Sequence, residues 1–292
     1  MISGSAPLPA RVWAYLLERF PPVAYTLLVG LFAASAFALT SHSTGQSVGL
    51  DVALRAGAVV LLVFFHLRIM DEHKDHVSDS AAYPERCLSR GVVTLPLLFK
   101  LGVCSVLLEA GLAVSLSASA ALAWLGCVVF TVLMRFEFGV GDWLNRHLLV
   151  YAVTHNPVVA LLGFFLWTVG GGAHNALMWL YLAVISVGSL AFEIGRKIRL
   201  PHEEIADVES YSSVLGKRGA DRLLVGLRLV TGLGVLALSI LLQQWIIGAV
   251  ALGLQVGLAA LLLARPQRAK ITEGVATVGL LLDFVWIWVI AC

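Results

Sequence analysis

Charged residues are scarce in this chain. Asp, Glu, Lys and Arg make up 13% of its 292 residues and hydrophobic residues 59%, whereas a soluble domain carries about 25% charged residues. Nearly the whole length falls into apolar runs and short connections, so no separate soluble domain fits. The composition therefore indicates an integral membrane protein in contact with the lipid bilayer, and no nucleic-acid partner is expected.

Cysteine is also rare, and its spacing excludes two kinds of site. The four cysteines, Cys87, Cys104, Cys127 and Cys292, show no CxxC or CxxH pattern. Neither a zinc site nor a disulfide framework is therefore expected. The chain also lacks the glycine-rich elements GxxxxGK and GxGxxG, which bind nucleotide phosphates.

Long apolar runs dominate the rest of the sequence. Each is near the length that a helix needs to cross about 30 Å of hydrocarbon. The runs are continuously apolar, whereas the strands of a membrane barrel would alternate. The sequence therefore predicts an all-α, polytopic membrane protein with about nine transmembrane helices. These helices are expected at residues 23–40, 52–70, 95–116, 119–134, 148–170, 175–192, 223–242, 246–264 and 275–291.

Two parts of the chain are expected to behave differently. Residues 1–22 are predicted to form an N-terminal interfacial segment, because charged and bulky residues alternate before the first apolar run. Residues 23–292 are predicted to form one nine-helix membrane domain. Lys and Arg are absent from loops such as 41–51 and 171–174 but present in the alternate loops. This asymmetry predicts a cytoplasmic N-terminus, and the short loops favour a bacterial plasma membrane.

A cluster of carboxylates follows the second apolar run, where residues 71–79 read DEHKDHVSD. If the helix continues past Met70, Asp71, Asp75 and Asp79 lie on one face, with Glu72 beside them. Like charges at this spacing repel each other unless a cation lies between them. Mg²⁺ favours a few carboxylates together with water and phosphate oxygens. The cluster therefore predicts a magnesium site at the cytoplasmic mouth, the alternative being a solvated loop.

A second cluster of charges follows the sixth apolar run. Phosphate oxygens bind well to cationic side chains placed among metal-binding carboxylates. The alternative is a salt-bridged loop that closes the cytoplasmic face. The acids of this cluster are Glu193, Glu203, Glu204, Asp207 and Glu209, and its cations are Arg196, Lys197 and Arg199.

The first cluster resembles a family signature. The pattern DExxDxxxD over residues 71–79, followed by Arg86 and Gly91, is similar to the NDxxDxxxD…RP…G signature of the UbiA superfamily of intramembrane prenyltransferases. This chain has Asp71 where the family usually has Asn, and Glu72 where it has Asp. Cys87 stands where the family has Pro, and the second motif is Glu-x-x-Arg-Lys rather than paired aspartates.

The resemblance implies a UbiA-like bundle of nine helices that binds an isoprenyl diphosphate with Mg²⁺. The diphosphate would leave, and the prenyl group would pass to an aromatic or other lipophilic acceptor. The implied catalytic residues and metal ligands are Asp71, Glu72, Asp75, Asp79 and Glu193, with Glu203, Glu204 and Asp207 as further metal ligands. The implied phosphate-binding residues are Arg86, Arg196, Lys197 and Arg199.

Two other functions remain open at this point. A terpene cyclase of the same superfamily would ionise the same isoprenoid substrate and quench the cation without an acceptor. A transporter for cations or anionic lipids would use the clusters as a cytoplasmic vestibule. A transporter is expected to carry its charges near mid-membrane, whereas this chain concentrates them at one mouth.

Polar residues inside the fifth apolar run are further candidates for substrate binding. Tyr151, His155 and Asn156 are predicted to contact the acceptor or to accept a proton, and a hydrogen bond between helices is the alternative. Pro157 follows directly and predicts a kink.

Two acids also lie alone within apolar runs. Glu109 and Asp283 are expected to form structural pairs, with Arg228 as a counter-ion for either, and a role as a catalytic base is the alternative.

Overall fold

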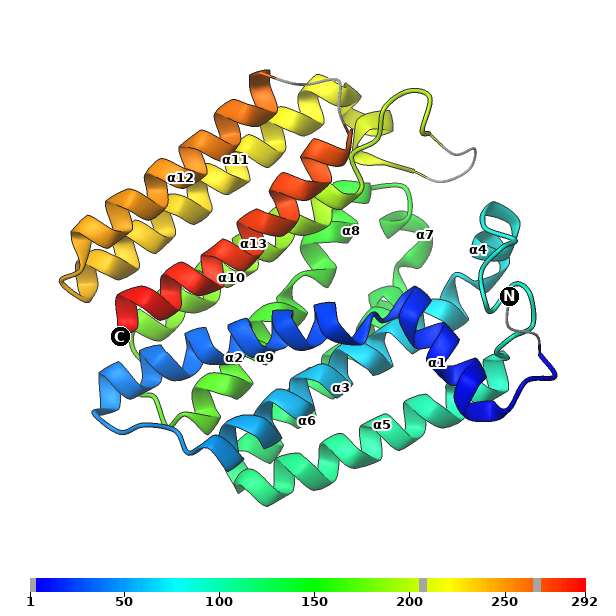
Figure 1. Cartoon of the computed structure of the whole chain (residues 1–292), viewed down its shortest axis with the longest axis horizontal. Coiled ribbons are helices and arrows are strands. Elements are labelled where there is room, and N and C mark those ends of the chain that lie inside the picture. The colour runs from blue at the N-terminus through cyan, green and yellow to red at the C-terminus, as the bar shows by residue number, and fades with distance from the viewer. Residues whose placement is uncertain (1–3, 205–208, 265–268) are drawn as a thin grey trace. The chain divides into compact units, whose positions relative to one another are not determined.

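The chain is built from helices. The computed structural model describes residues 4–204, 209–264 and 269–292, and within these residues it contains no strand. Nine spans in the described residues are long and apolar enough to cross a membrane, which confirms the all-α polytopic prediction. They are α2 (Pro22–Thr44), α3 (Leu50–Lys74), α5 (Leu95–Leu116), α6 (Ala118–Arg135), the pair α8 (Leu148–His155) and α9 (Pro157–Val169), α10 (Ala176–Arg196), α11 (Tyr211–Leu241), α12 (Trp245–Ala264) and α13 (Ala269–Ala291) (Figure 1).

The chain divides into two compact units. The first contains the chain up to Gly30 together with Leu50–Phe138, and the second contains Leu31–Gly49 and Gly139–Cys292. Helix α2 therefore contributes its first turns to one unit and the remainder to the other. The domain boundaries expected from sequence, 1–22 and 23–292, stay a prediction.

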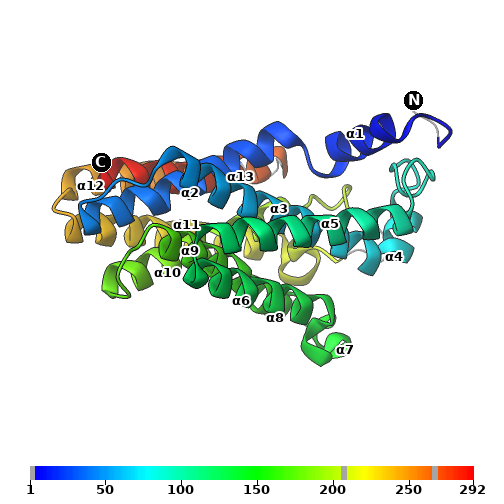
Figure 2. The same cartoon turned by 90° about the horizontal axis from the view of Figure 1, so that it is seen from below.

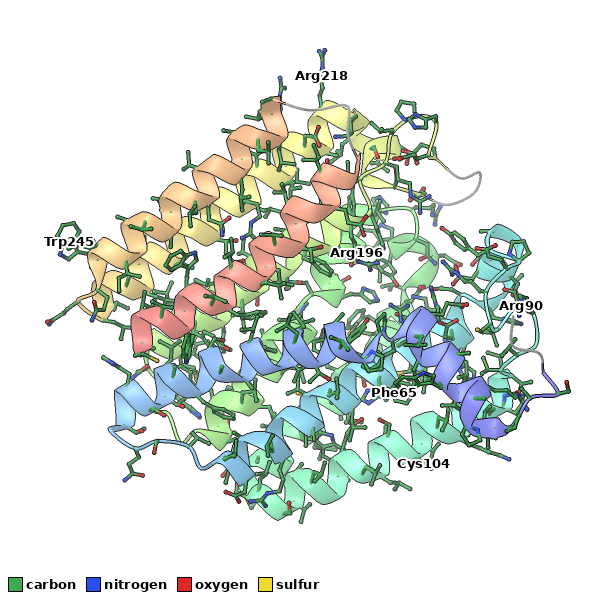
Figure 3. All side chains as sticks on the ribbon, in the orientation of Figure 1. Phe65, Arg90, Cys104, Arg196, Arg218 and Trp245 are labelled. Atoms are coloured by element: carbon green, nitrogen blue, oxygen red, sulfur yellow. The ribbon has the colours of Figure 1, made fainter. Side chains whose placement is uncertain are left out.

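In the first unit, α3 packs against α5 and α6, and α3 runs alongside α5 in both views (Figure 1, Figure 2). A short helix, α1 (Leu8–Arg19), buries Tyr15 against Ile69 and Leu98. This helix ends at Arg19 because Phe20 precedes Pro21, and a residue before proline avoids the helical conformation. Figure 3 shows Phe65 on α3, and this residue packs against the same apolar cluster.

A buried polar network joins three helices of the first unit. Glu109 of α5 lies with its Oε1 2.8 Å from Nδ1 of His66 on α3. The indole N–H of Trp124 on α6 donates to Glu109 Oε2 at 3.1 Å, and Nε2 of His66 lies 3.2 Å from the hydroxyl of Thr131. Glu109 thus has a structural pair, as expected. Its partner is His66, which sequence reasoning did not single out.

In the second unit, α10 packs against α9, α11 and α13, and α11 packs against α12. Arg228 on α11 donates from Nη1 and Nη2 to the two carboxylate oxygens of Asp283 on α13, at 2.9 and 2.7 Å. Gln255 on α12 donates to Asp283 Oδ1 at 2.8 Å. Arg228 is therefore the counter-ion of Asp283, and the network ties three helices together.

Two helix boundaries depend on residues within the spans. The fifth span is divided, because α8 ends at His155 and α9 begins at Pro157, where the kink was predicted. Helix α11 begins at Tyr211 rather than at residue 223, because Ser210 caps it and the side chain of Ser213 bonds back to the backbone of Ser210. The apolar pattern alone missed this polar first part of the helix.

Candidate functional site

The first cluster lies where α3 ends and α4 (His76–Ala82) begins. The predicted unbroken helix through Asp79 is wrong, because α3 ends at Lys74 and Asp75 leaves the helical conformation at φ −99° and ψ 9°. Aspartate disfavours helix interiors because its short side chain competes for backbone groups. The one-turn spacing nevertheless persists: the N–H of Asp75 donates to the carbonyl of Asp71, and that of Asp79 donates to Asp75, both at 2.8 Å.

Arg19 of α1 connects two carboxylates of this cluster. Its Nε lies 2.6 Å from Oε1 of Glu72, which is only 3% exposed. Its Nη2 lies 3.4 Å from Oδ2 of Asp79, and Nη1 of Arg86 lies 2.6 Å from the same oxygen. Two carboxylates from α3 and α4 therefore face one guanidinium group. Sequence reasoning assigned Arg19 only to an interfacial helix.

Helix α1 is held to the segment after α4 by polar contacts. Arg11 donates from Nε to the carbonyl of Val92 at 2.6 Å. Both carboxylate oxygens of Glu18 accept the backbone N–H of Cys87, at 2.9 and 3.2 Å. Proline has no N–H, so this contact would be lost if residue 87 were the Pro of the related signature. The replacement of Pro by Cys87 therefore provides a hydrogen bond that holds α1 against residue 87.

Burial and nearby acids keep two groups of this region neutral. Burial, together with the Glu18 carboxylate, raises the pKa of the Cys87 thiol to about 11. Burial and the charge of Glu72 raise the pKa of the Tyr15 phenol above its usual range. Both groups are therefore protonated at neutral pH, and neither adds negative charge to the cluster.

The other acids of the first cluster are more open. Asp71 is 54% exposed, and its Oδ2 lies 3.7 Å from Nη1 of Arg68, which is longer than a hydrogen bond. Asp75 is exposed as well. Lys74, which lies between the acids, has its Nζ 2.6 Å from Oε1 of Glu137.

The residues present fit a divalent cation by their chemistry. Carboxylate oxygens are the ligands that Mg²⁺ favours, with water and phosphate completing its shell. The carboxylates of Glu72 and Asp79 both contact one positively charged group, the guanidinium of Arg19. Within the described part of the chain, no group of three or more His, Cys, Asp or Glu side chains is placed around one ion position.

The second cluster begins in the last turn of α10, where Figure 3 shows Arg196. Arg196 Nη2 lies 2.5 Å from Oε2 of Glu193, and Lys197 Nζ lies 2.8 Å from Oε1. Both oxygens of Glu193 thus meet cations that follow it by three and four residues, as helical geometry favours.

The remaining acids of this cluster make local contacts in the loop that leads to α11. Glu203 Oε2 accepts the N–H of Leu200 at 3.0 Å, and Glu204 Oε1 accepts the hydroxyl of Ser210 at 2.7 Å. The backbone N–H of Arg199 donates to Ser212 at 2.7 Å. Asp207 lies outside the described residues. The assignment of these residues to metal and phosphate stays a prediction.

The polar residues of the fifth span make two kinds of contact, a ring stack within the span and hydrogen bonds to α10. The rings of Tyr151 and His155 stack at 3.9 Å between centroids. Asn156 donates from Nδ2 to the carbonyl of Ser186 at 2.8 Å and accepts the hydroxyl of Ser189 at 2.6 Å. Asn156 therefore makes the hydrogen bonds between helices that were the structural alternative for this group.

Comparisons with known proteins identify relatives by structure only. The sequence matches no protein-family profile, and it matches no curated protein. A structure of digeranylgeranylglyceryl phosphate synthase superposes with a TM-score of 0.64 at 17% identity, covering 97% of this chain and 99% of that one.

Two archaeal structures give the same result. A UbiA homologue from Aeropyrum pernix K1 superposes with a TM-score of 0.69 at 17% identity, over 90% of this chain and 97% of that one. A UbiA homologue from Archaeoglobus fulgidus, bound to GPP and Mg²⁺, has a TM-score of 0.64 at 11% identity, over 94% and 99% of the two chains. This membrane protein therefore has the UbiA fold along nearly its whole length.

Proposed function

We propose that this protein is a Mg²⁺-dependent intramembrane prenyltransferase that acts on an isoprenyl diphosphate and a lipophilic acceptor. The observation that carries the proposal is the pairing of Glu72 and Asp79 on the guanidinium of Arg19. This arrangement places carboxylates and cationic forks together at the end of α3. The proposal is supported by the fold, because UbiA homologues of this fold bind GPP or DMAPP together with Mg²⁺.

The reaction that we propose breaks one C–O bond and forms one bond to the acceptor. The electron pair of the C–O bond leaves with the diphosphate, and an allylic cation remains. The acceptor supplies an electron pair to this cation and then loses a proton. When bound, Mg²⁺ neutralises charge that develops on the departing diphosphate.

The chain's own residues have three roles in this proposal. Carboxylates bind Mg²⁺, and guanidinium and ammonium groups hold the phosphate oxygens of the substrate. Tyr151 and His155 contact the acceptor in this proposal, and Asn156 supports them through its hydrogen bonds to Ser186 and Ser189. The carboxylates are Asp71, Glu72, Asp75, Asp79 and Glu193, with Glu203, Glu204 and Asp207. The phosphate-binding groups are Arg86, Arg196, Lys197 and Arg199.

We further propose that the N-terminus and the mouth of the site face the cytoplasm of a bacterial cell. In the second unit, Arg218 projects from one end of the α11 and α12 pair and Trp245 from the other end (Figure 3). Basic residues are typical of the cytoplasmic side and tryptophan of both interfaces. Labelling of single cysteines placed at positions 218 and 245 in sealed vesicles tests this orientation.

The function is tested with purified protein in detergent. We expect release of pyrophosphate from geranyl, farnesyl or geranylgeranyl diphosphate when Mg²⁺ and quinone-like or lipid acceptors are present, with a prenylated acceptor as product. Cyclic or hydroxylated terpenes formed without an acceptor would instead identify a cyclase. Absence of pyrophosphate release with every combination would overturn both assignments.

A further inference from the structure

Arg19 is the charged partner of a buried carboxylate. Glu72 is only 3% exposed, and its Oε1 lies 2.6 Å from the Nε of Arg19, whose side chain is 17% exposed. A carboxylate held away from water requires a positive partner, because an isolated buried charge is costly. In this structure that partner comes from α1, a helix outside the nine spans.

The same guanidinium group extends to a second acid. Nη2 of Arg19 lies 3.4 Å from Oδ2 of Asp79, and Nη1 of Arg86 contacts this oxygen at 2.6 Å. Asp79 therefore has a closer cation of its own, whereas Glu72 depends on Arg19. One oxygen of Glu72 on α3 and one of Asp79 on α4 thus face a single guanidinium group.

The guanidinium group stands where a metal ion bound by these two oxygens would lie. Mg²⁺ binds oxygen ligands at about 2.0–2.1 Å and requires a near-octahedral shell, which leaves no room for a second cation between the same oxygens. Two cations this close also repel each other strongly where little water screens them. A metal ion held by Oε1 of Glu72 and Oδ2 of Asp79 therefore requires Arg19 to move away.

The position of Arg19 depends on the docking of α1. Tyr15, one helical turn before Arg19, is fully buried. Arg11 and Glu18 make hydrogen bonds to the segment that follows α4. Arg19 is the last residue of α1, so its contacts with the acids fix the end of the helix. Release of Arg19 removes one of the polar contacts that hold α1 in place.

We propose that Arg19 is an internal competitor of the metal ion, and that α1 acts as a latch that closes the first cluster until Mg²⁺ displaces the guanidinium group. The inference rests on the proposed function, because it assigns a regulatory contact to the same site. It accounts for the near-complete burial of Glu72, a carboxylate that we propose to bind a metal ion.

Binding of Mn²⁺ to the full chain in detergent tests the inference without turnover. Mn²⁺ favours the same oxygen ligands as Mg²⁺, and electron paramagnetic resonance measures the unbound ion. We expect Arg19→Met to bind Mn²⁺ about tenfold more tightly than the wild type, the gain expected if the latch is open in about one-tenth of the molecules. Lys100→Met removes an exposed positive charge from α5, and we expect it to bind like the wild type. Equal or weaker affinity of Arg19→Met would overturn the inference.

A second variant keeps a cation beside Glu72. Arg19→Lys retains the charge that the buried carboxylate requires but lacks the planar fork that contacts two acids. We expect it to keep most of the thermal stability of the wild type and to bind Mn²⁺ several-fold more tightly. If Arg19→Met does not fold and Arg19→Lys binds Mn²⁺ no better than the wild type, the inference fails.

Hydrogen exchange in the wild type tests the latch itself. We expect the backbone N–H groups of α1, and that of Cys87, which donates to Glu18, to exchange faster when Mg²⁺ is added, because α1 is then held by fewer contacts. The N–H groups of α12, which belong to the second unit, are the internal control and should not change. Exchange in α1 that stays the same or slows in saturating Mg²⁺ would contradict the latch.

These measurements also distinguish the inference from the proposed function. If Arg19→Met binds Mn²⁺ more tightly but neither protein releases pyrophosphate from prenyl diphosphates, the proposed function fails and the latch stands. If the wild type turns over with Mg²⁺ and Arg19→Met has the same Mn²⁺ affinity as the wild type, only the inference fails. If neither protein binds Mn²⁺, both the latch and the proposed metal site are contradicted.

Discussion

In the first cluster, Glu72 and Asp79 meet guanidinium groups from other segments of the chain, whereas in the second cluster Glu193 meets cations of its own helix. Arg19 lies 53 residues before Glu72 in the sequence, while Arg196 and Lys197 follow Glu193 by three and four residues. The first arrangement depends on the docking of α1, and the second forms wherever α10 is helical. Changes in the first cluster should therefore disturb both chemistry and folding, and changes in the second mainly chemistry.

Neutralising one carboxylate in each cluster gives the largest expected effect. Asp75→Asn and Glu193→Gln should each lower pyrophosphate release by about 10²–10³-fold, because each removes charge that holds the cation against the leaving group. Initial rates with Mg²⁺ and a prenyl diphosphate measure the loss. Glu85→Gln serves as the control with normal turnover. A variant that keeps the wild-type rate would remove its residue from the proposed metal ligands.

Removing one arginine from each cluster should separate their effects on stability. Arg19→Met leaves the buried Glu72 without its guanidinium partner, and we expect a loss of about 3 kcal/mol in the free energy of unfolding. Arg196 is 40% exposed, so Arg196→Met should cost less than about 1 kcal/mol. Thermal unfolding in detergent compares the two. Equal losses would mean that α1 does not hold the first cluster.

Restoring the proline of the related signature should harm this chain. Cys87→Pro removes the N–H that donates to Glu18, and we expect a loss of about 1–2 kcal/mol in the free energy of unfolding. Cys87→Ala keeps the N–H and is the matched control. If proline is tolerated as well as alanine, the contact between α1 and residue 87 contributes nothing measurable.

The smallest expected effect concerns the reactivity of Cys87. Its pKa of about 11 means that only about one thiol in a thousand is ionised at pH 8, so alkylation should be slow and should accelerate as the pH rises toward 11. Because the folded pKa lies above the usual 9.0, the group stabilises the fold fully below pH 9 and loses this contribution as the pH rises through 11. Rates are measured after Cys104 and Cys292, both exposed, are changed to Ser.

Glu18→Gln tests how much the Glu18 carboxylate contributes to the raised pKa of Cys87. It removes the charge that disfavours the thiolate of Cys87, so alkylation at pH 8 should become faster. An unchanged rate would mean that burial alone raises the pKa.

Local sequence features predicted much of the fold. The nine spans follow from apolar runs that exclude other structures in a bilayer. Proline at position 157 predicted the break between α8 and α9. Arg228 was predicted as a counter-ion for either Glu109 or Asp283, because an isolated charge inside a span requires a partner, and the structure pairs it with Asp283.

Contacts between distant segments were not predicted. A single sequence does not show that Arg19 reaches Glu72, that His66 reaches Glu109, or that the turn at Glu137 reaches Lys74, because these contacts depend on how helices pack. The break at Asp75 was missed for a different reason. The four-residue spacing of the acids favours a continuous helix, but local conformational preferences of Asp oppose it.

The most direct test of the central claim is pyrophosphate release by the wild-type protein with and without a divalent cation. The protein in detergent is supplied with a prenyl diphosphate and acceptors, in Mg²⁺ or in excess EDTA. We expect release in Mg²⁺, loss of release in EDTA and recovery when Mg²⁺ is restored. Release that continues unchanged in EDTA would contradict the proposal that the two acidic clusters act through a bound metal ion.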